Sequence, residues 1–71
     1  MAANDTQIAG THYQSKAIQP WDYIAANGLG YFAGNVVKYV SRYQDKGGVD
    51  DLRKAQHYLQ KLIEIEGQKN A

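Results

Sequence analysis

The residues with the greatest chemical potential form a row of positive charge in the middle of the chain. Lys38, Arg42 and Lys46 follow one another at four-residue intervals, so a helix would place all three on one face. Asn35 precedes this row by about one turn, and Tyr39 lies beside it. Cations that bind phosphate oxygens, a ring that stacks on a base and an amide that reads the base edge together make up a nucleotide site.

A second row of the same kind lies further along the chain. Lys54, His57 and Lys61 are three and four residues apart, and Tyr58 is adjacent to them. If two helices turn these rows toward each other, cations and an imidazole meet beside aromatic rings, which predicts a binding site for nucleotide phosphates. The alternative is a solvated polar face on each helix, because charged rows opposite apolar stripes have the same spacing.

The candidate acids and bases have structural alternatives of their own. His12 and Tyr13 lie outside any predicted helix, where His12 would act as a general acid or base and Tyr13 would either close over a pocket or fix the arm to the core. Asp51 is a candidate proton acceptor, and with Asp50 it would either hold Mg²⁺ or cap a helix. His57 would be a phosphate ligand or a histidine at the boundary of the core.

Other classes of site are excluded by what the sequence lacks. It has no GxxxxGKS/T phosphate loop and no HExxH pair, and it has no cysteine for a disulfide, a thiolate zinc site or a covalent nucleophile. No metal site is predicted, although a kinase would need ATP and Mg²⁺. No apolar run is long enough to cross a membrane and the N-terminus does not resemble a secretory signal, so the expected location is the cytoplasm of an infected cell.

Two helices are predicted to position the first basic row. Pro20 fits the first turn of a helix over about residues 20–27, and Gly28 is a signal for its end. A second helix is predicted over about residues 31–45. Gly34 lies inside this second helix, which indicates that a neighbouring helix or a ligand comes close there.

The third predicted helix carries the second basic row. It begins with Asp50 or Asp51 as its cap and ends at Gly67. Its predicted apolar stripe consists of Leu52, Ala55, Tyr58, Leu59, Leu62 and Ile65. The predicted fold is therefore all-α, with three helices of which the last two form an antiparallel hairpin.

The length of the chain limits its core. With 71 residues it is one domain, predicted over residues 12–67 between a flexible arm (1–11) and a frayed end (68–71). Lone cores of this size rarely contribute more than about 3–5 kcal/mol, so without a disulfide we expect a homo-oligomer. A net charge of +1 gives little counterion release, so nucleic acid is not an expected partner.

Four segments in order resemble the SaV-like family of small bacteriophage proteins, whose domain also occurs in the nucleotide kinase of phage T7. They are HYQ (12–14), IQPWDYI (18–24), GNVVKYVSRY (34–43) and DLRKAQHYL (51–59). The resemblance runs from about residue 12 to residue 63. It implies a phage protein with an all-helical fold that assembles into oligomers and binds or phosphorylates nucleoside monophosphates without a Walker motif.

The resemblance also favours particular residues, namely His12, Tyr13, Gln19, Gly34, Asn35, Lys38, Tyr39, Arg42, Asp51, Lys54 and Tyr58. The phage kinase is longer than this chain, so a shorter version would keep binding with or without catalysis. Three functions stay open. They are a nucleotide kinase with His12 or Asp51 as proton acceptor, a binding protein that sequesters host nucleotide signals, and a factor that binds a host protein through Trp21, Phe32 and the tyrosines.

Overall fold

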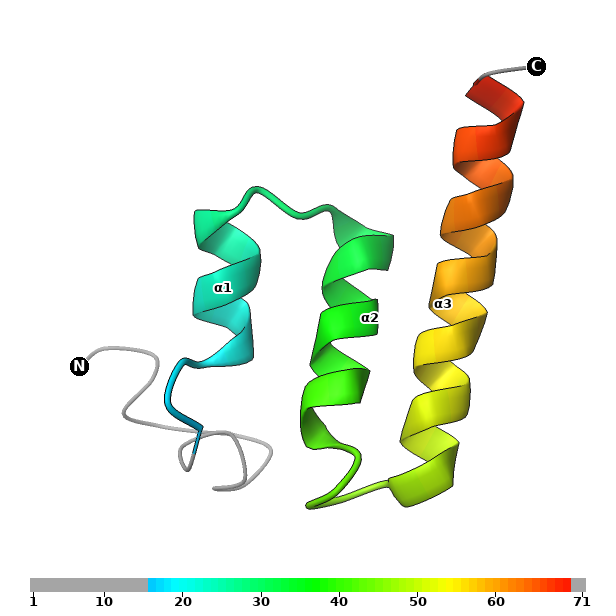
Figure 1. Ribbon diagram of the computed structural model, residues 1–71. Helices are drawn as coiled ribbons and strands as arrows, with labels where there is room; N and C mark the ends of the chain where they lie inside the picture. Colours follow the sequence, from blue (N-terminus) through cyan, green and yellow to red (C-terminus); the bar gives the residue numbers. More distant parts are fainter. Residues whose placement is uncertain (1–15, 70–71) are drawn as a thin grey trace.

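The computed structural model describes residues 16–69 and shows three helices in that part of the chain. They are α1 (Pro20–Ala26), α2 (Tyr31–Arg42) and α3 (Gly48–Lys69). Residues 16–69 contain no strand, which confirms the predicted all-α class. α2 lies in the middle and packs on both neighbours, whereas α1 and α3 do not pack on each other (Figure 1). The C-terminal end of α3 extends past the other two helices (Figure 1).

α1 begins and ends where its sequence signals predicted. Pro20 occupies the first turn, and Gln19 before it is extended (φ −66°, ψ 135°), as a residue preceding proline prefers to be. Gly28 adopts a positive φ of 64° directly after the helix, a conformation that costs glycine little. A Cβ placed on Gly34 of α2 would lie 3.2 Å from Ile24 Cγ2, so the close approach expected at this glycine is the contact with α1.

The turn between α2 and α3 differs from the prediction at both of its ends. α2 ends at Arg42, before the predicted Asp45, and the Arg42 carbonyl there accepts hydrogen bonds from the N–H groups of both Asp45 and Lys46, each at 3.0 Å. α3 begins at Gly48, which has a φ of 55°. Neither Asp50 nor Asp51 is therefore the N-cap, contrary to the prediction, and both lie in the first turn of α3.

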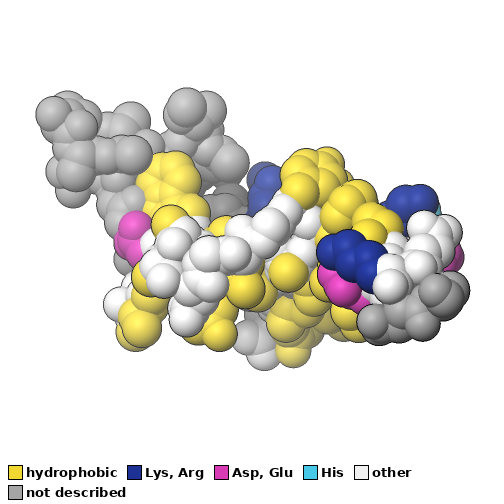
Figure 2. Space-filling model, turned by 90° about the horizontal axis from the view of Figure 1, so that it is seen from above, with side chains coloured by type: hydrophobic (Ala, Val, Ile, Leu, Met, Phe, Trp, Pro, Cys, Tyr) yellow, Lys and Arg dark blue, Asp and Glu magenta, His cyan; other side chains and the backbone are white. Residues whose placement is uncertain are grey.

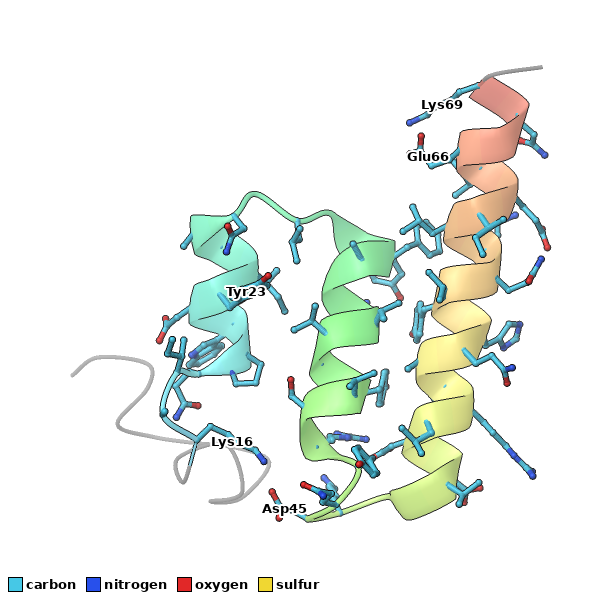
Figure 3. All side chains as sticks on the ribbon, viewed as in Figure 1. Lys16, Tyr23, Asp45, Glu66 and Lys69 are labelled. Carbon is cyan, nitrogen blue, oxygen red and sulfur yellow. The ribbon has the colours of Figure 1, made fainter. Side chains whose placement is uncertain are left out.

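An ion pair connects the segment before α1 to this same turn. Lys16 Nζ lies 3.0 Å from Asp45 Oδ2, and Figure 3 shows the two side chains pointing toward each other. Both side chains are partly exposed, so the pair stabilises the fold by a small amount. Its effect is to hold the start of the described chain near the α2–α3 turn.

The described part of the chain buries few side chains. Its buried residues are Pro20, Gly34, Asp51 and Ala55. The predicted apolar stripe of α3 divides in two, because a single neighbouring helix covers only part of the circumference of α3. Ala55, Tyr58, Leu62 and Ile65 are buried or half-buried, whereas Leu52 and Leu59 are 38% and 44% exposed. Figure 2 shows apolar side chains spread over the surface seen from above.

Candidate functional site

A buried ion pair lies where α2 meets the first turn of α3. Arg42 donates two hydrogen bonds to Asp51, from Nε to Oδ2 at 3.0 Å and from Nη2 to Oδ1 at 3.1 Å. The backbone N–H of Gly47 donates a third to Oδ2 at 2.9 Å. The Asp51 side chain is 1% exposed, and its hydrogen bonds with Arg42 hold its pKa below the ordinary value although burial opposes this. Asp51 is therefore a buried carboxylate that stays ionised and fixes the Arg42 side chain.

Three cations surround the ring of Tyr39. Arg42 Cζ lies 4.6 Å from the ring centroid, and the ammonium groups of Lys38 and Lys54 lie 5.2 and 5.4 Å from it. Each distance is short enough for a cation–π interaction. Lys54 Nζ is also 4.0 Å from Asp51 Oδ1. The basic rows of α2 and α3 thus meet at Tyr39, and two of the three positive side chains, Arg42 and Lys54, also contact the Asp51 carboxylate.

Next to this cluster an open hollow of about 470 Å³ lies between α2 and α3. It is lined by Phe32 and Tyr39 from α2 and by Lys54, His57, Tyr58 and Lys61 from α3. The rings of Tyr39 and Tyr58 stack with their centroids 5.8 Å apart and their planes 14° from parallel. We refer to this space as the α2–α3 hollow. In it α2 supplies only rings, and every cation comes from α3.

The tyrosines around this hollow form one aromatic cluster. Tyr31 meets Phe32 and Tyr58 edge to face, at centroid distances of 5.1 and 5.8 Å. A hydrogen bond with Tyr31 raises the pKa of Tyr58 above its ordinary value, and burial and the neighbouring hydroxyls of Tyr31 and Tyr39 act in the same direction. Tyr58 therefore keeps its proton at neutral pH, and that proton is engaged in the hydrogen bond with Tyr31.

None of the remaining predicted site residues that the structure describes lines the α2–α3 hollow. The Asn35 side chain donates to the Tyr31 carbonyl of its own helix at 2.8 Å. Lys38 and Arg42 contact Tyr39 but do not line the hollow. His12 and Tyr13 lie outside the described residues.

Two lining residues were not singled out from the sequence as individual binding residues. Phe32 was named in the surface for a host protein, and Lys61 only as a member of the second basic row. Phe32 and Tyr39 are seven residues apart, as are Lys54 and Lys61. Residues seven apart lie on the same side of a helix after about two turns, so this spacing was the signal that could have found them.

A second hollow, of about 440 Å³, lies between α1 and α2 and has a different character. Ile18, Pro20 and Tyr23 line it together with Val36, Val37, Val40 and Ser41 of α2, so no charged group faces it. In residues 16–69 no cluster of three or more His, Asp or Glu side chains is placed to hold a metal ion. None of the three described helices is both long and apolar enough to cross a membrane.

Comparison with known proteins gives a match to a family model. Neither the curated proteins nor the solved structures contain a significant match to this chain. A family model described as a protein of unknown function, DUF3310, matches residues 8–60. This match spans α1, α2, the turn and the larger part of α3, and so includes the Arg42–Asp51 pair. Because it covers more than half of the 71 residues, the chain belongs to the DUF3310 family.

Proposed function

We propose that this protein binds a nucleotide in the α2–α3 hollow, with lysines holding its phosphates and aromatic rings holding its base. The observation that supports this most strongly is the lining of the hollow, which combines two lysines, one histidine and three aromatic rings without a carboxylate. The volume of about 470 Å³ lies within the range of about 300–1,000 Å³ that is typical of small-molecule sites.

Lys54 and Lys61 would bind the phosphates. Seven residues of α-helix separate them by about 10 Å along the axis, and His57 lies between them. This separation suits a ligand with more than one phosphate group, such as a nucleoside diphosphate or a dinucleotide. Because Arg42 already neutralises Asp51, that buried carboxylate adds little repulsion toward an anion, and Lys38 adds further positive charge nearby.

The rings of Tyr39 and Tyr58 would bind the base. They already stack on each other, and a base that extends this stack needs no rearrangement of the helices. Stacking of a base on an aromatic side chain contributes about 1–3 kcal/mol and accepts any base. The oxygen of the Tyr58 hydroxyl, whose proton is engaged with Tyr31, can accept a hydrogen bond from the base or the sugar.

We propose binding without phosphoryl transfer, which favours sequestration of a nucleotide over a kinase. A general base needs a free lone pair and a pKa near the operating pH. Oδ2 of Asp51 accepts from Arg42 and Gly47, Oδ1 accepts from Arg42, and the pKa of Asp51 is lowered. These contacts suit Asp51 to fixing Arg42 more than to accepting a proton from substrate.

Calorimetric titration with a panel of mononucleotides, nucleoside diphosphates and cyclic dinucleotides tests this function. We expect the Lys54→Ala and Lys61→Ala variants to bind the preferred ligand about 10- to 100-fold more weakly, because each removes a charge-assisted hydrogen bond of about 1.5–3 kcal/mol. The matched control is Arg53→Ala, which removes an exposed cation of the same helix that does not line the hollow.

Two results would count against this function. The first is absence of heat with every nucleotide up to millimolar concentration, and the second is equal weakening by Arg53→Ala. Incubation with labelled ATP and each deoxynucleoside monophosphate distinguishes sequestration from a kinase, and we expect no diphosphate product. If diphosphate does form, the protein is an enzyme and His12 becomes the first residue to substitute.

The resemblance to SaV-like phage proteins supplies the proposed setting. We propose that α2 and α3 form an antiparallel hairpin, that the chain assembles into a homo-oligomer, and that it acts in the cytoplasm of an infected cell. The few buried side chains of residues 16–69 support self-association, because a small domain with so little core gains stability by covering apolar surface on another copy.

A further inference from the structure

A second apolar stripe runs along α3, separate from the side chains that face α2. Its members recur at intervals of three, four, three and four residues, and they are Val49, Leu52, Gln56, Leu59 and Ile63. The four apolar side chains are 38–61% exposed. Intervals of three and four are the a and d positions of a heptad repeat, the pattern by which helices pair along their length. We refer to this set as the outer stripe.

We infer that the outer stripe pairs α3 with α3 of a second copy in parallel and in register. The residue types select this occupant. Val49 and Ile63 are β-branched and stand at a positions, whereas Leu52 and Leu59 stand at d positions. β-branched residues at a positions with leucine at d positions favour a parallel coiled coil of two helices. The inference gives a surface to the self-association in the proposed function and rests on that part of it.

Gln56 is the polar exception in the outer stripe, and it explains why the partner is an identical chain. It occupies the middle a position, with apolar residues on both sides. In a parallel pair in register it faces Gln56 of the second copy, and the two amides can hydrogen bond to each other. A polar residue at a single a position fixes the register of a coiled coil and the number of helices in it. An unrelated apolar helix would leave this amide without a partner.

The positions that flank the outer stripe permit this pairing. In a parallel pair each g residue faces the e residue five positions later on the other chain, so Ala55 faces Gln60 and Leu62 faces Gly67. These flanking pairs bring no like charges together. Beyond the outer stripe, Glu66 at the next d position would face Glu66 of the second copy, and its ion pair with Lys69 at 3.1 Å offsets part of that repulsion.

Pairing through the outer stripe would leave the α2–α3 hollow open. At 100° per residue, the outer stripe and the lysines of the hollow lie on opposite sides of the α3 face that packs on α2. Lys54, His57 and Lys61 therefore remain accessible in the pair. Association and ligand binding can thus be tested independently.

Sedimentation equilibrium over a range of concentrations tests the outer stripe. We expect the wild-type chain to dimerise and Leu59→Asp to weaken the dimer at least 100-fold, since it places a carboxylate in the seam. Gln68→Asp is the matched control, because it adds the same charge at an exposed position on the side of α3 away from the outer stripe and should change the dimer constant less than threefold. A monomeric wild type, or equal dimers from both variants, would overturn the inference.

Disulfide trapping tests the orientation and does not depend on the folding of Leu59→Asp. The chain has no cysteine, so Glu66→Cys introduces one at the next d position. In a parallel pair the two thiols face each other and should cross-link readily under mild oxidation. An antiparallel pair with Leu52 opposite Ile63 would separate them by about 25 Å. Glu64→Cys, off the stripe, should not cross-link, and cross-linking at residue 64 but not at residue 66 would refute the assignment.

The two proposals fail in different ways. Leu59→Asp should bind the preferred nucleotide as wild type does, because Leu59 does not line the hollow. A wild type that binds nucleotide as a monomer would overturn the outer stripe and leave the site standing. A wild type that cross-links at residue 66 without binding any nucleotide would do the reverse.

Discussion

The α2–α3 turn yields a prediction about Gly47→Ala, whose effect on stability should change from harmful to favourable when Asp51 is also replaced. A Cβ on Gly47 would overlap the carboxylate of Asp51, so Gly47→Ala displaces that carboxylate from Arg42 and from the Gly47 N–H. The backbone of Gly47 itself lies outside the positive-φ region, so alanine meets no other obstacle there. When Asp51 is replaced by alanine, the space is empty and Gly47→Ala should no longer be harmful.

The magnitudes follow from the geometry of the two turn glycines. Gly48→Ala forces a residue with a Cβ to a φ of 55° in open space, which costs about 1–2 kcal/mol. Gly47→Ala should cost more than this, because it breaks charged hydrogen bonds of a buried group. In the Asp51→Ala background it should instead stabilise by about 0.4–1 kcal/mol, because alanine lowers the entropy of the unfolded chain.

Thermal melting followed by circular dichroism measures this cycle. For a domain of this size about 1 kcal/mol shifts Tm by about 4–8 °C, so the change of sign is readily resolved. All four proteins are melted in a stabilising osmolyte, which keeps the Asp51→Ala pair folded at the start. If Gly47→Ala lowers Tm equally in both backgrounds, Asp51 is not what requires glycine at residue 47, and the reasoning is refuted.

Two further predictions concern acid stability and the α1–α2 contact. The pKa of folded Asp51 lies below its ordinary value of 3.8, so in mild acid the unfolded chain binds more protons than the folded chain. The Arg42–Asp51 pair therefore stabilises the fold fully above pH 3.8. This stabilisation is lost as the pH falls through the pKa of folded Asp51. Melts between pH 3 and 6 should show Tm falling below about pH 4 in the wild type and less steeply in Asp51→Asn; parallel curves would contradict this. Gly67→Ala, in open space, should gain up to about 1 kcal/mol of helix propensity, whereas Gly34→Ala should gain less because its Cβ lies 3.2 Å from Ile24 Cγ2. Denaturant unfolding of both variants checks this, and an equal gain would show that Ile24 does not restrict the site.

The sequence predicted the helices well because their signals are local. Pro20, Gly28 and the glycines of the second turn each act on the backbone within one or two residues. Periodicity also located both basic rows. It could not show that Arg42 pairs with Asp51, because that contact crosses a turn between residues nine apart and depends on where the turn places the two helices.

The periodicity of the sequence could not predict how the apolar stripe of α3 divides, for a different reason. Leu52 and Leu59 share a broad apolar arc with Ala55 and Leu62, and the pattern does not reveal how much of that arc one neighbour covers. The assignment of rings to α2 and cations to α3 in the hollow likewise depends on the rotation of each helix about its axis. The sequence restricts that rotation only to the width of the apolar stripe.

The arrangement in which α2 lies between two helices that do not touch has a consequence for how the chain folds. Within residues 16–69 every contact between helices joins neighbours along the chain, which is a topology of low contact order. Such topologies collapse quickly, since only short loops must close before apolar side chains meet. Among the three described helices, α1 spans about two turns and packs only on α2, so it can detach while the longer pair stays intact and is the first of the three to open.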